Sequence, residues 1–309
     1  MPDANQAKLD SRGLLLAFLA YLLWGAFPLY FHLLSAADPV EIIGHRLVWT
    51  NVFCLAGVLV WREWTHLRAV VADRKLFWRL TLAGVLVSAN WLIYVWGVLN
   101  NHIVDAALGY FINPLFTVAL AVFVLGEKLR RAQLVAVAIG ILAVVVIAVG
   151  YGQIPWVALS LAVTFGIYGL VKKQVGGRVS PLVGLTVETT MLAPVALAYL
   201  VWLQASGHGA YLAHGPGLTV ALTLAGAVTA IPLLMFAAAS SRIPLSMMGF
   251  IQYLTPVIQF ALGVWVNHEE MPLARWLGFG LVWLAVVVLT VDGVRAARRP
   301  DIIEPEVVN

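Results

Sequence analysis

Residues 110–146 of the chain read YFINPLFTVALAVFVLGEKLRRAQLVAVAIGILAVVV. Two long apolar runs stand on either side of the short charged stretch GEKLRR at positions 126–131. A helix needs about 20 apolar residues to cross the hydrocarbon core of a bilayer, and each run approaches that length. Neither run alternates apolar and polar residues, as a strand of a membrane barrel would. The stretch therefore predicts two membrane-spanning helices joined by a basic turn.

The composition of the whole chain extends this prediction. Of its 309 residues, 62% are hydrophobic and 11% are charged, whereas a soluble domain carries about 25% charged residues. A soluble fold is therefore excluded, and lipid admits only helices or closed barrels. The single cysteine, Cys54, excludes a disulfide framework. The apolar stretch 13–34 has no small-residue cleavage pattern, so we expect it to be retained as the first helix.

The chain is predicted to be an all-α integral membrane protein with ten transmembrane helices. Turn residues such as Asp38-Pro39, Ser180-Pro181 and Gly215-Pro216 separate its apolar stretches. The expected spans are 13–34, 40–61, 76–99, 103–125, 133–150, 154–171, 181–204, 217–240, 244–267 and 273–294.

The positions of the basic residues predict the orientation, because cytoplasmic loops carry an excess of Lys and Arg. With ten spans, 17 of the 19 basic residues fall on one side. They are Lys8, Arg12, Arg62, Arg68, Arg74, Lys75, Arg79, Lys128, Arg130, Arg131, Lys172, Lys173, Arg178, Arg242, Arg295, Arg298 and Arg299. Arg275 lies at the edge of the last span on the other side, and Arg46 lies within the second span. We therefore expect both termini to be cytoplasmic, and the asymmetry explains the basic pI without a nucleic-acid partner.

The opening stretch recurs in the second half of the chain. Residues 252–288, QYLTPVIQFALGVWVNHEEMPLARWLGFGLVWLAVVV, align with residues 110–146 without gaps at an offset of 142. A similar offset, 141, places Trp24-Gly25 on Phe165-Gly166. The predicted domains are a cytoplasmic tail (1–12), a five-helix repeat (13–150), a second five-helix repeat (151–294) and a cytoplasmic tail (295–309). Because five spans is an odd number, the repeats would insert in opposite orientations, which is typical of secondary transporters. A purely structural duplication is the alternative.

Four segments resemble the EamA family of the drug/metabolite transporter superfamily and, within it, the RarD proteins. They are LLLAFLAYLLWGAFPLYFHLL (14–34), EIIGHRLVWT (41–50), NWLIYVWGVLNNHIVDAALGYFINPLFTVALAVFVLGEKLRRAQ (90–133) and GFIQYLTPVIQFALGV (249–264). The resemblance implies a ten-helix inverted-repeat fold and export of metabolites or drugs across the inner membrane. Proteins of the RarD type are commonly called chloramphenicol permeases. The chain departs from the family at His268-Glu269, where the first half has Gly126-Glu127, and this concerns a local turn.

Polar side chains at helical spacing predict the wall of a central cavity, because polar groups in a membrane turn toward partners or a wet interior. Pro114 and Pro256 lie in mid-span within two such stripes, and each removes a backbone hydrogen bond, which would free the carbonyl of Tyr110 or Gln252. The alternative is that these side chains only join neighbouring helices. The two stripes are Tyr110, Asn113 and Thr117 in span 103–125, and Gln252, Thr255 and Gln259 in span 244–267.

Further candidates are mostly aromatic, and they suit an amphipathic or aromatic solute by stacking. Ordinary core packing is the alternative for each of them. The candidates are Asn90, Trp91 and Tyr94 in the third span, Trp24 and Phe27 in the first, and Phe165 and Tyr168 in the sixth.

Two charged residues lie inside predicted spans, Arg46 and Glu188. Arg46 is expected either to capture an anionic group, with Glu41, His45 or Asp105 as partners, or to anchor in the outer leaflet. Glu188 is expected either to couple transport to protons or to form a structural pair on the cytoplasmic side. Because the two residues fall in opposite leaflets, with each free to reach its nearer surface, we expect no direct pair between them.

Glu127 and Glu269 are interpreted as structural, since a carboxylate near the start of the following helix is stabilised by the exposed N–H groups there. The histidines form no recognisable metal motif.

The leading hypothesis for function is a secondary transporter in the bacterial inner membrane that exports small organic solutes by alternating access. It is expected to be no enzyme, to need no cofactor, and to have a small-molecule substrate and the lipid bilayer as its partners. The chain has no phosphate-binding G-x-x-x-x-G-K-[ST] loop that would indicate ATP hydrolysis. The alternatives are a membrane-embedded enzyme and a non-transporting sensor or assembly protein.

Overall fold

The computed structural model describes residues 10–126 and 130–297, and within these ranges all regular structure is helical. The first crossing consists of α1 (Ser11–Gly25) and α2 (Phe27–His32). The other elements of the first half are α3 (Pro39–Val60), the short α4 (Trp64–Ala72), α5 (Arg74–Leu99), α6 (Ile103–Leu125) and α7 (Arg131–Tyr151).

The second half begins with α8 (Trp156–Val175), a 3-10 turn (Gly176–Arg178), α9 (Pro181–Thr190) and α10 (Ala193–Ala205). It continues with α11 (Gly215–Ser240), α12 (Leu245–Ile251), α13 (Leu254–Ala261), a π-helical turn (Leu262–Val266) and α14 (Leu273–Ala297). Within the described residues nine helices are long and apolar enough to cross a membrane, and a tenth crossing results if α9 and α10 count as one span. The chain is therefore a multi-pass helical protein, as the sequence predicts, while the inverted relation of its halves stays a prediction.

The expected span 181–204 is a bent pair of helices rather than one continuous helix. The axes of α9 and α10 differ by 49° across the break after Thr190. Pro194 stands in the first turn of α10 and has no N–H to offer the Thr190 carbonyl. The hydroxyl of Thr190 also donates to the Thr186 carbonyl over 2.6 Å, a bond that competes with the helical ladder. Glu188, near the end of α9, is buried two residues before this break.

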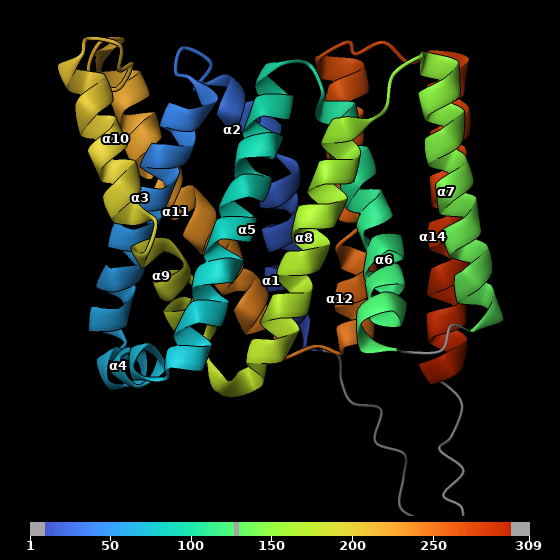
Figure 1. Ribbon diagram of the computed structural model, residues 1–309, viewed down its shortest axis with the longest axis horizontal. Coiled ribbons are helices and arrows are strands. Elements are labelled where there is room, and N and C mark those ends of the chain that lie inside the picture. The colour runs from blue at the N-terminus through green and yellow to red at the C-terminus, as the bar shows by residue number, and fades with distance from the viewer. Residues whose placement is uncertain (1–9, 127–129, 298–309) are drawn as a thin grey trace, which may run out of the picture.

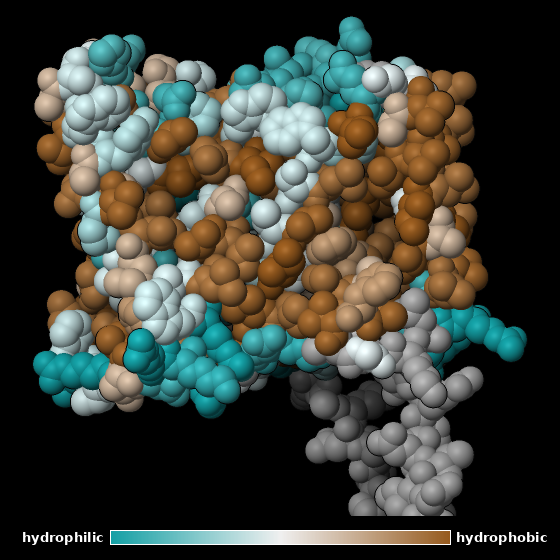
Figure 2. Space-filling model, in the orientation of Figure 1, coloured by the Kyte–Doolittle hydropathy of each residue, from teal (hydrophilic) through white to brown (hydrophobic). Residues whose placement is uncertain are grey.

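The helices run side by side (Figure 1). In the orientation of Figures 1 and 2, an apolar band crosses the middle of the visible face, and hydrophilic residues gather at both ends. Helix α4, which the sequence did not predict, lies across the lower end. The start of α1 and the end of α14 lie at this lower end too, and near them Arg242 pairs with Asp10 over 3.6 Å. Most of the described basic residues are in the helix ends and turns that lie at this lower end, which we call the basic end.

Small residues allow the central helices to approach closely. A side chain at Gly226 in α11 would collide with the backbone of Trp49 and Thr50 in α3, and one at Gly84 in α5 would collide with the backbone of Glu188. Close backbone contact through glycine is a common way for membrane helices to associate. The Gly226 contact sets Thr229, one turn along α11, against the side chain of Arg46 in α3. Helices α7 and α14 pair at the far right of Figure 1.

Candidate functional site

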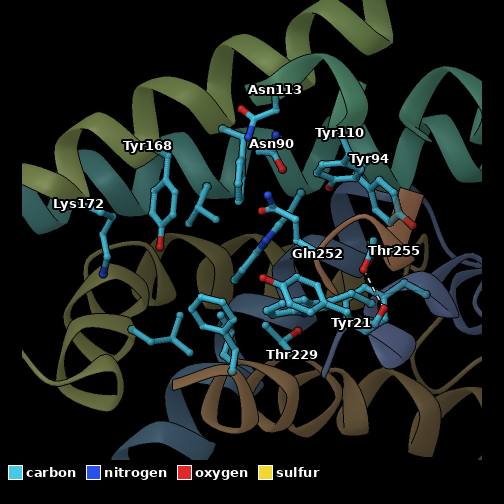
Figure 3. Close-up of a pocket in the computed structure, with 18 of the residues that line it drawn as sticks. Tyr21, Asn90, Tyr94, Tyr110, Asn113, Tyr168, Lys172, Thr229, Gln252 and Thr255 are labelled. Carbon is cyan, nitrogen blue, oxygen red and sulfur yellow. Dashed lines mark hydrogen bonds between the residues drawn. The ribbon is translucent and has the colours of Figure 1, made fainter. Parts of the chain in front are cut away.

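A cavity of about 540 Å³ lies between helices of both halves of the chain. Helices α1, α2, α3, α5 and α6 line it from the first half, and α8, α9, α11 and α13 line it from the second. Its volume is within the range of about 300–1,000 Å³ that ligand pockets occupy. Figure 3 shows Lys172 and Tyr168 on one side, Tyr94 and Tyr110 on the other, and Gln252 between them.

Most of the side chains that the sequence proposed for a cavity do line this one. They are Trp24, Phe27, Arg46, Asn90, Trp91, Tyr94, Tyr110, Asn113, Phe165, Tyr168, Glu188, Gln252, Thr255 and Gln259. The structure thus brings together residues that are spread across the chain from the first helix to the ninth span. This placement is a fact of geometry, and their role in binding stays a prediction.

Thr117 does not belong to the cavity, in contrast to the prediction. Its side chain is exposed, and its hydroxyl donates to the carbonyl of Asn113 over 2.9 Å. The spacing of Tyr110, Asn113 and Thr117 is helical, but the cavity wall ends with Asn113 and Pro114. The hydroxyl of a threonine in a helix commonly donates a hydrogen bond to the carbonyl one turn earlier, so it needs no other polar partner.

The expected release of the Gln252 carbonyl is also not found. The carbonyl accepts the N–H of Thr255 over 3.3 Å, because the chain makes a turn between α12 and α13. A continuous helix kinked at Pro256 would have left it free. Gln252 contributes its side chain to the cavity instead.

Several of the polar lining side chains join neighbouring helices. The hydroxyl of Thr255 donates to the carbonyl of Tyr21 over 2.7 Å, and the amide of Gln259 donates to the carbonyl of Trp24 over 3.2 Å. Asn90 donates to the Leu161 carbonyl over 3.1 Å. Each of these contacts links the two halves of the chain. These three side chains therefore join neighbouring helices, as the alternative interpretation of the sequence predicted, and also line the cavity.

Other polar atoms around the cavity have no hydrogen-bond partner among the described residues. They are the Nη1 of Arg46, the hydroxyl of Tyr94, the Oδ1 of Asn113 and the Oε1 of Gln259. Each atom is buried, and an unpaired polar atom in a buried site is costly. A ligand or ordered water in the cavity would satisfy them.

Aromatic rings form much of the wall. The rings of Tyr94 and Tyr110 lie 5.9 Å apart, and Tyr110 meets Phe165 edge to face at 6.2 Å. Tyr21 and Trp24 pack with Phe236 on the opposite wall at 6.0 and 5.9 Å. Tyr21 and Phe236 are additions that helical spacing alone did not identify. Such a wall suits a flat or apolar solute body.

Arg46 is held among aromatic rings rather than anchored at the surface. Its side chain is buried, with the residue 4% exposed, and its Nε donates to the Thr229 hydroxyl over 2.8 Å. Its Cζ lies 4.0 Å from the ring centre of Trp91. The structure contradicts both the anchor interpretation and the expected partners Glu41, His45 and Asp105. Residues from two further helices, which sequence spacing could not bring together, take their place.

The expected partners of Arg46 are occupied elsewhere. Glu41 accepts the N–H groups of Ala210 and Tyr211 over 2.8 and 3.1 Å. Asp105 pairs with Arg275 over 2.9 Å. His45 stacks on the ring of Tyr211, with ring centres 4.4 Å apart.

Glu188 forms an ion pair with Lys172. The Lys172 Nζ lies 2.5 Å from Glu188 Oε1, and the Tyr168 hydroxyl donates to Oε2 over 3.4 Å. Glu188 is 1% exposed, so it does not reach a surface as the sequence interpretation allowed. No direct pair with Arg46 is found among the described residues, as expected, although both line the same cavity. Lys172 was missed, although it stands one helical turn after Tyr168.

At the end opposite the basic end, the two halves are joined by contacts that we call the upper contact cluster: Glu269 on Ile103 and Val104, and Arg275 on Asp105. Glu269 therefore binds the start of α6, not that of the following helix α14, because the loop after Val266 folds over α6. Burial raises the pKa of Glu269, while the two backbone hydrogen bonds act in the opposite direction. The matching prediction for Glu127 lies outside the described residues.

Comparisons with known proteins match the chain to one family of transporters. The model of the EamA-like transporter family matches twice, at residues 11–149 and 154–291. The protein called RarD from Streptomyces exfoliatus is 47% identical over 287 residues, covering 93% of this chain and 90% of that one. An uncharacterized transporter from Vibrio cholerae is 40% identical and covers 96% of this chain and 98% of its own.

A solved structure, entitled "Crystal structure of protein", has the same fold at 19% identity. Its TM-score is 0.58, and the match covers 93% of this chain and 99% of that one.

Proposed function

This chain belongs to the EamA-like transporter family and is a multi-pass membrane transporter, and from that premise we propose that it exports small organic metabolites or drugs across the bacterial inner membrane by alternating access. The observation that carries the proposal is the cavity of about 540 Å³, which both halves of the chain line. Its apolar and aromatic wall, with a few unpaired polar atoms, suits a small organic solute.

In this proposal the solute reaches the cavity from the basic end. Lys172, Val179 and Pro181 line its part toward the basic end, where α8 meets α9. At the other end the upper contact cluster joins the two halves. A transporter that has its cavity open to one side and closed to the other must rearrange these contacts to release the solute. The structure corresponds, in this proposal, to the state open toward the cytoplasm.

The proposed orientation is that of two inverted five-helix repeats with both termini in the cytoplasm. Two separate matches of one family model support a duplication. The collection of basic residues at one end supports a cytoplasmic location for that end.

Labelling of single cysteines in intact cells tests the orientation, starting from a variant in which the buried Cys54 is replaced by serine. Arg68→Cys at the basic end should react with an impermeant maleimide only after the cells are opened. His208→Cys, in the loop between α10 and α11 at the other end, should react in intact cells. The reverse pattern would place the termini outside.

Transport itself is tested with the purified protein in liposomes. Amino acids, nucleosides, small aromatic metabolites and chloramphenicol would be screened for flux with and without a pH gradient. We expect saturable flux that Asn113→Ala combined with Gln252→Ala reduces by at least about tenfold, since both side chains line the cavity. Thr117→Ala is the matched control, because Thr117 lies one turn from Asn113 on the same helix and outside the cavity.

The outcomes separate the parts of the proposal. If the double variant retains the flux, the protein is a transporter but Asn113 and Gln252 do not form its binding site. Dependence on the pH gradient would identify proton coupling, and its absence would identify a facilitator. Absence of flux for the whole panel would count against transport of these classes of solute.

A further inference from the structure

The cavity contains one positive charge that the described residues do not balance. Three of its lining residues carry a formal charge: Arg46, Lys172 and Glu188. Lys172 and Glu188 neutralise each other through their 2.5 Å ion pair. Arg46 forms no ion pair with any described carboxylate, and its neighbours are neutral. The net charge around the cavity is therefore that of a single guanidinium.

The surroundings of Arg46 make an unbalanced charge expensive. Besides Trp91, the rings of Phe31 and Phe27 lie 5.5 and 5.6 Å from its Cζ. Rings stabilise a cation by their faces, but by far less than a counter-ion would. A buried charge of this kind is normally paired.

The hydrogen bonds of the guanidinium show where an anion would bind. The Nε is occupied by Thr229, which fixes the orientation of the planar group. Neither Nη group donates a hydrogen bond to a described residue, and Nη1 is buried. The two Nη groups form one edge of the guanidinium, and such an edge matches the two oxygens of a carboxylate. The unpaired hydroxyl of Tyr94 offers a further donor on the cavity wall.

The rest of the cavity indicates the body of such a ligand. Tyr94 and Tyr110 provide aromatic surface near Arg46, and the unpaired Asn113 Oδ1 and Gln259 Oε1 can accept hydrogen bonds. A single uncompensated positive charge favours a monoanion over a dianion such as a phosphate monoester, which would leave one negative charge buried without a partner.

We propose that the solute is a small organic carboxylate with an aromatic or apolar body, and that Arg46 binds its carboxylate through the two Nη groups. The proposal rests on the proposed function, since it names the substrate class of the same cavity. It assigns Arg46 a direct contact with the solute and Thr229 the task of positioning Arg46.

Binding to the purified wild-type protein in detergent tests the proposal first, without any requirement for transport. The probes are benzoate and 3-phenylpropanoate, their primary amides, and phenyl phosphate, each titrated by calorimetry. We expect each acid to bind roughly 10- to 100-fold more tightly than its amide, the range of one charge-assisted contact. Phenyl phosphate, as the dianion arm, is expected to bind more weakly than the acids. Equal affinities of acid and amide, or binding of neither, would overturn the proposal.

Variants assign the preference to Arg46. Arg46→Gln is expected to reduce the affinity for the acid to that for the amide, whereas Arg46→Lys should keep part of the preference. Arg68→Gln is the matched control, because Arg68 also stacks on a tryptophan, Trp64, at 5.5 Å but lies exposed on α4. If Arg46→Gln does not fold, Thr229→Val keeps the charge and releases Nε, and it should weaken acid binding several-fold. An acid preference that survives both variants would contradict the assignment.

Flux in liposomes separates this proposal from the proposed function. Saturable flux of neutral solutes with no preference for acids would support the proposed function and contradict the carboxylate site. If Arg46→Gln abolishes acid binding but no acid is transported, the carboxylate site is supported and transport of acids is contradicted.

Discussion

The carboxylate of Glu269 accepts a hydrogen bond from the backbone N–H of Ile103 over 2.5 Å, although the two residues are 166 positions apart. A second bond, from the N–H of Val104 over 3.0 Å, completes the contact. These are the first N–H groups of α6, which have no partner within their own helix. Glu269 is 8% exposed. The fourth span, in the first half of the chain, is therefore capped at its start by a residue of the second half.

Removal of this carboxylate should destabilise the upper contact cluster. Glu269→Ala leaves two buried N–H groups without an acceptor, and we expect the free energy of unfolding to fall by about 2 kcal/mol. Chemical or thermal unfolding in detergent measures the change. Glu270→Ala is the control, because the Glu270 side chain is exposed and its backbone carbonyl, which binds Arg275, remains. Equal stability of the two variants would contradict a capping role for Glu269.

The raised pKa of Glu269 makes its contribution depend on pH. Glu269 lies between the spans Met247–Val266 and Leu273–Arg295, and burial is the main cause of the shift. An acid whose pKa is higher in the folded than in the unfolded protein gives its full stabilisation below the unfolded pKa and loses it as the pH rises through the folded pKa.

The stability of the wild type relative to Glu269→Gln should therefore decrease as the pH is raised from about 4 to about 8, a range that begins near the ordinary carboxyl pKa. Unfolding of both proteins across this series measures the difference, and titratable groups common to both cancel. A difference that is constant or increases with pH would show that the carboxyl is not destabilised in its charged form.

The sequence predicted the spans well because hydrophobic length is a local property. The expected limits of the third span, 76–99, and of the fourth, 103–125, differ little from α5 (Arg74–Leu99) and α6 (Ile103–Leu125). The break between α9 and α10 was missed, although Glu188-Thr189-Thr190 and Pro194 interrupt the apolar run there, because the stretch as a whole has the length of a span. Amphipathic α4 was missed because a helix lying at the membrane end has neither the length nor the apolar content of a span.

The site was predicted in part, for a physical reason. Residues such as Asn113 and Gln252 are polar inside apolar spans, and that contrast is visible in a sequence. The partners proposed for Arg46 were wrong and none was proposed for Glu188, because the partner of a buried charge depends on which helices touch. Arg46 meets Thr229 only because Gly226 lets α11 approach the backbone of α3. Interhelical distances of this kind are set by the packing of the whole bundle.

Gly226→Ala should test this close approach. The added methyl group would collide with the backbone of Trp49, which cannot move aside as a flexible side chain could. We expect a loss of about 1–3 kcal/mol in stability, together with weaker positioning of Arg46 by Thr229. Unfolding in detergent measures the loss. Gly280→Ala in α14 is the control, because open space surrounds that position and alanine is the better helix former. Similar behaviour of both variants would argue against a tight α3–α11 contact.

The Lys172–Glu188 pair is expected to be structural rather than a site of proton coupling. Glu188→Gln leaves Lys172 without its 2.5 Å partner, and Lys172→Met leaves a buried carboxylate unpaired, so each single change should cost about 2 kcal/mol or more. The double variant should lose less than the sum, with a coupling energy of about 1–3 kcal/mol. Unfolding of the four proteins gives this energy, and flux in liposomes gives the second readout. A structural pair predicts that the double variant keeps whatever response to a pH gradient the wild type has. Loss of that response, with exchange of solute across the membrane retained, would instead identify Glu188 as the proton-coupling group.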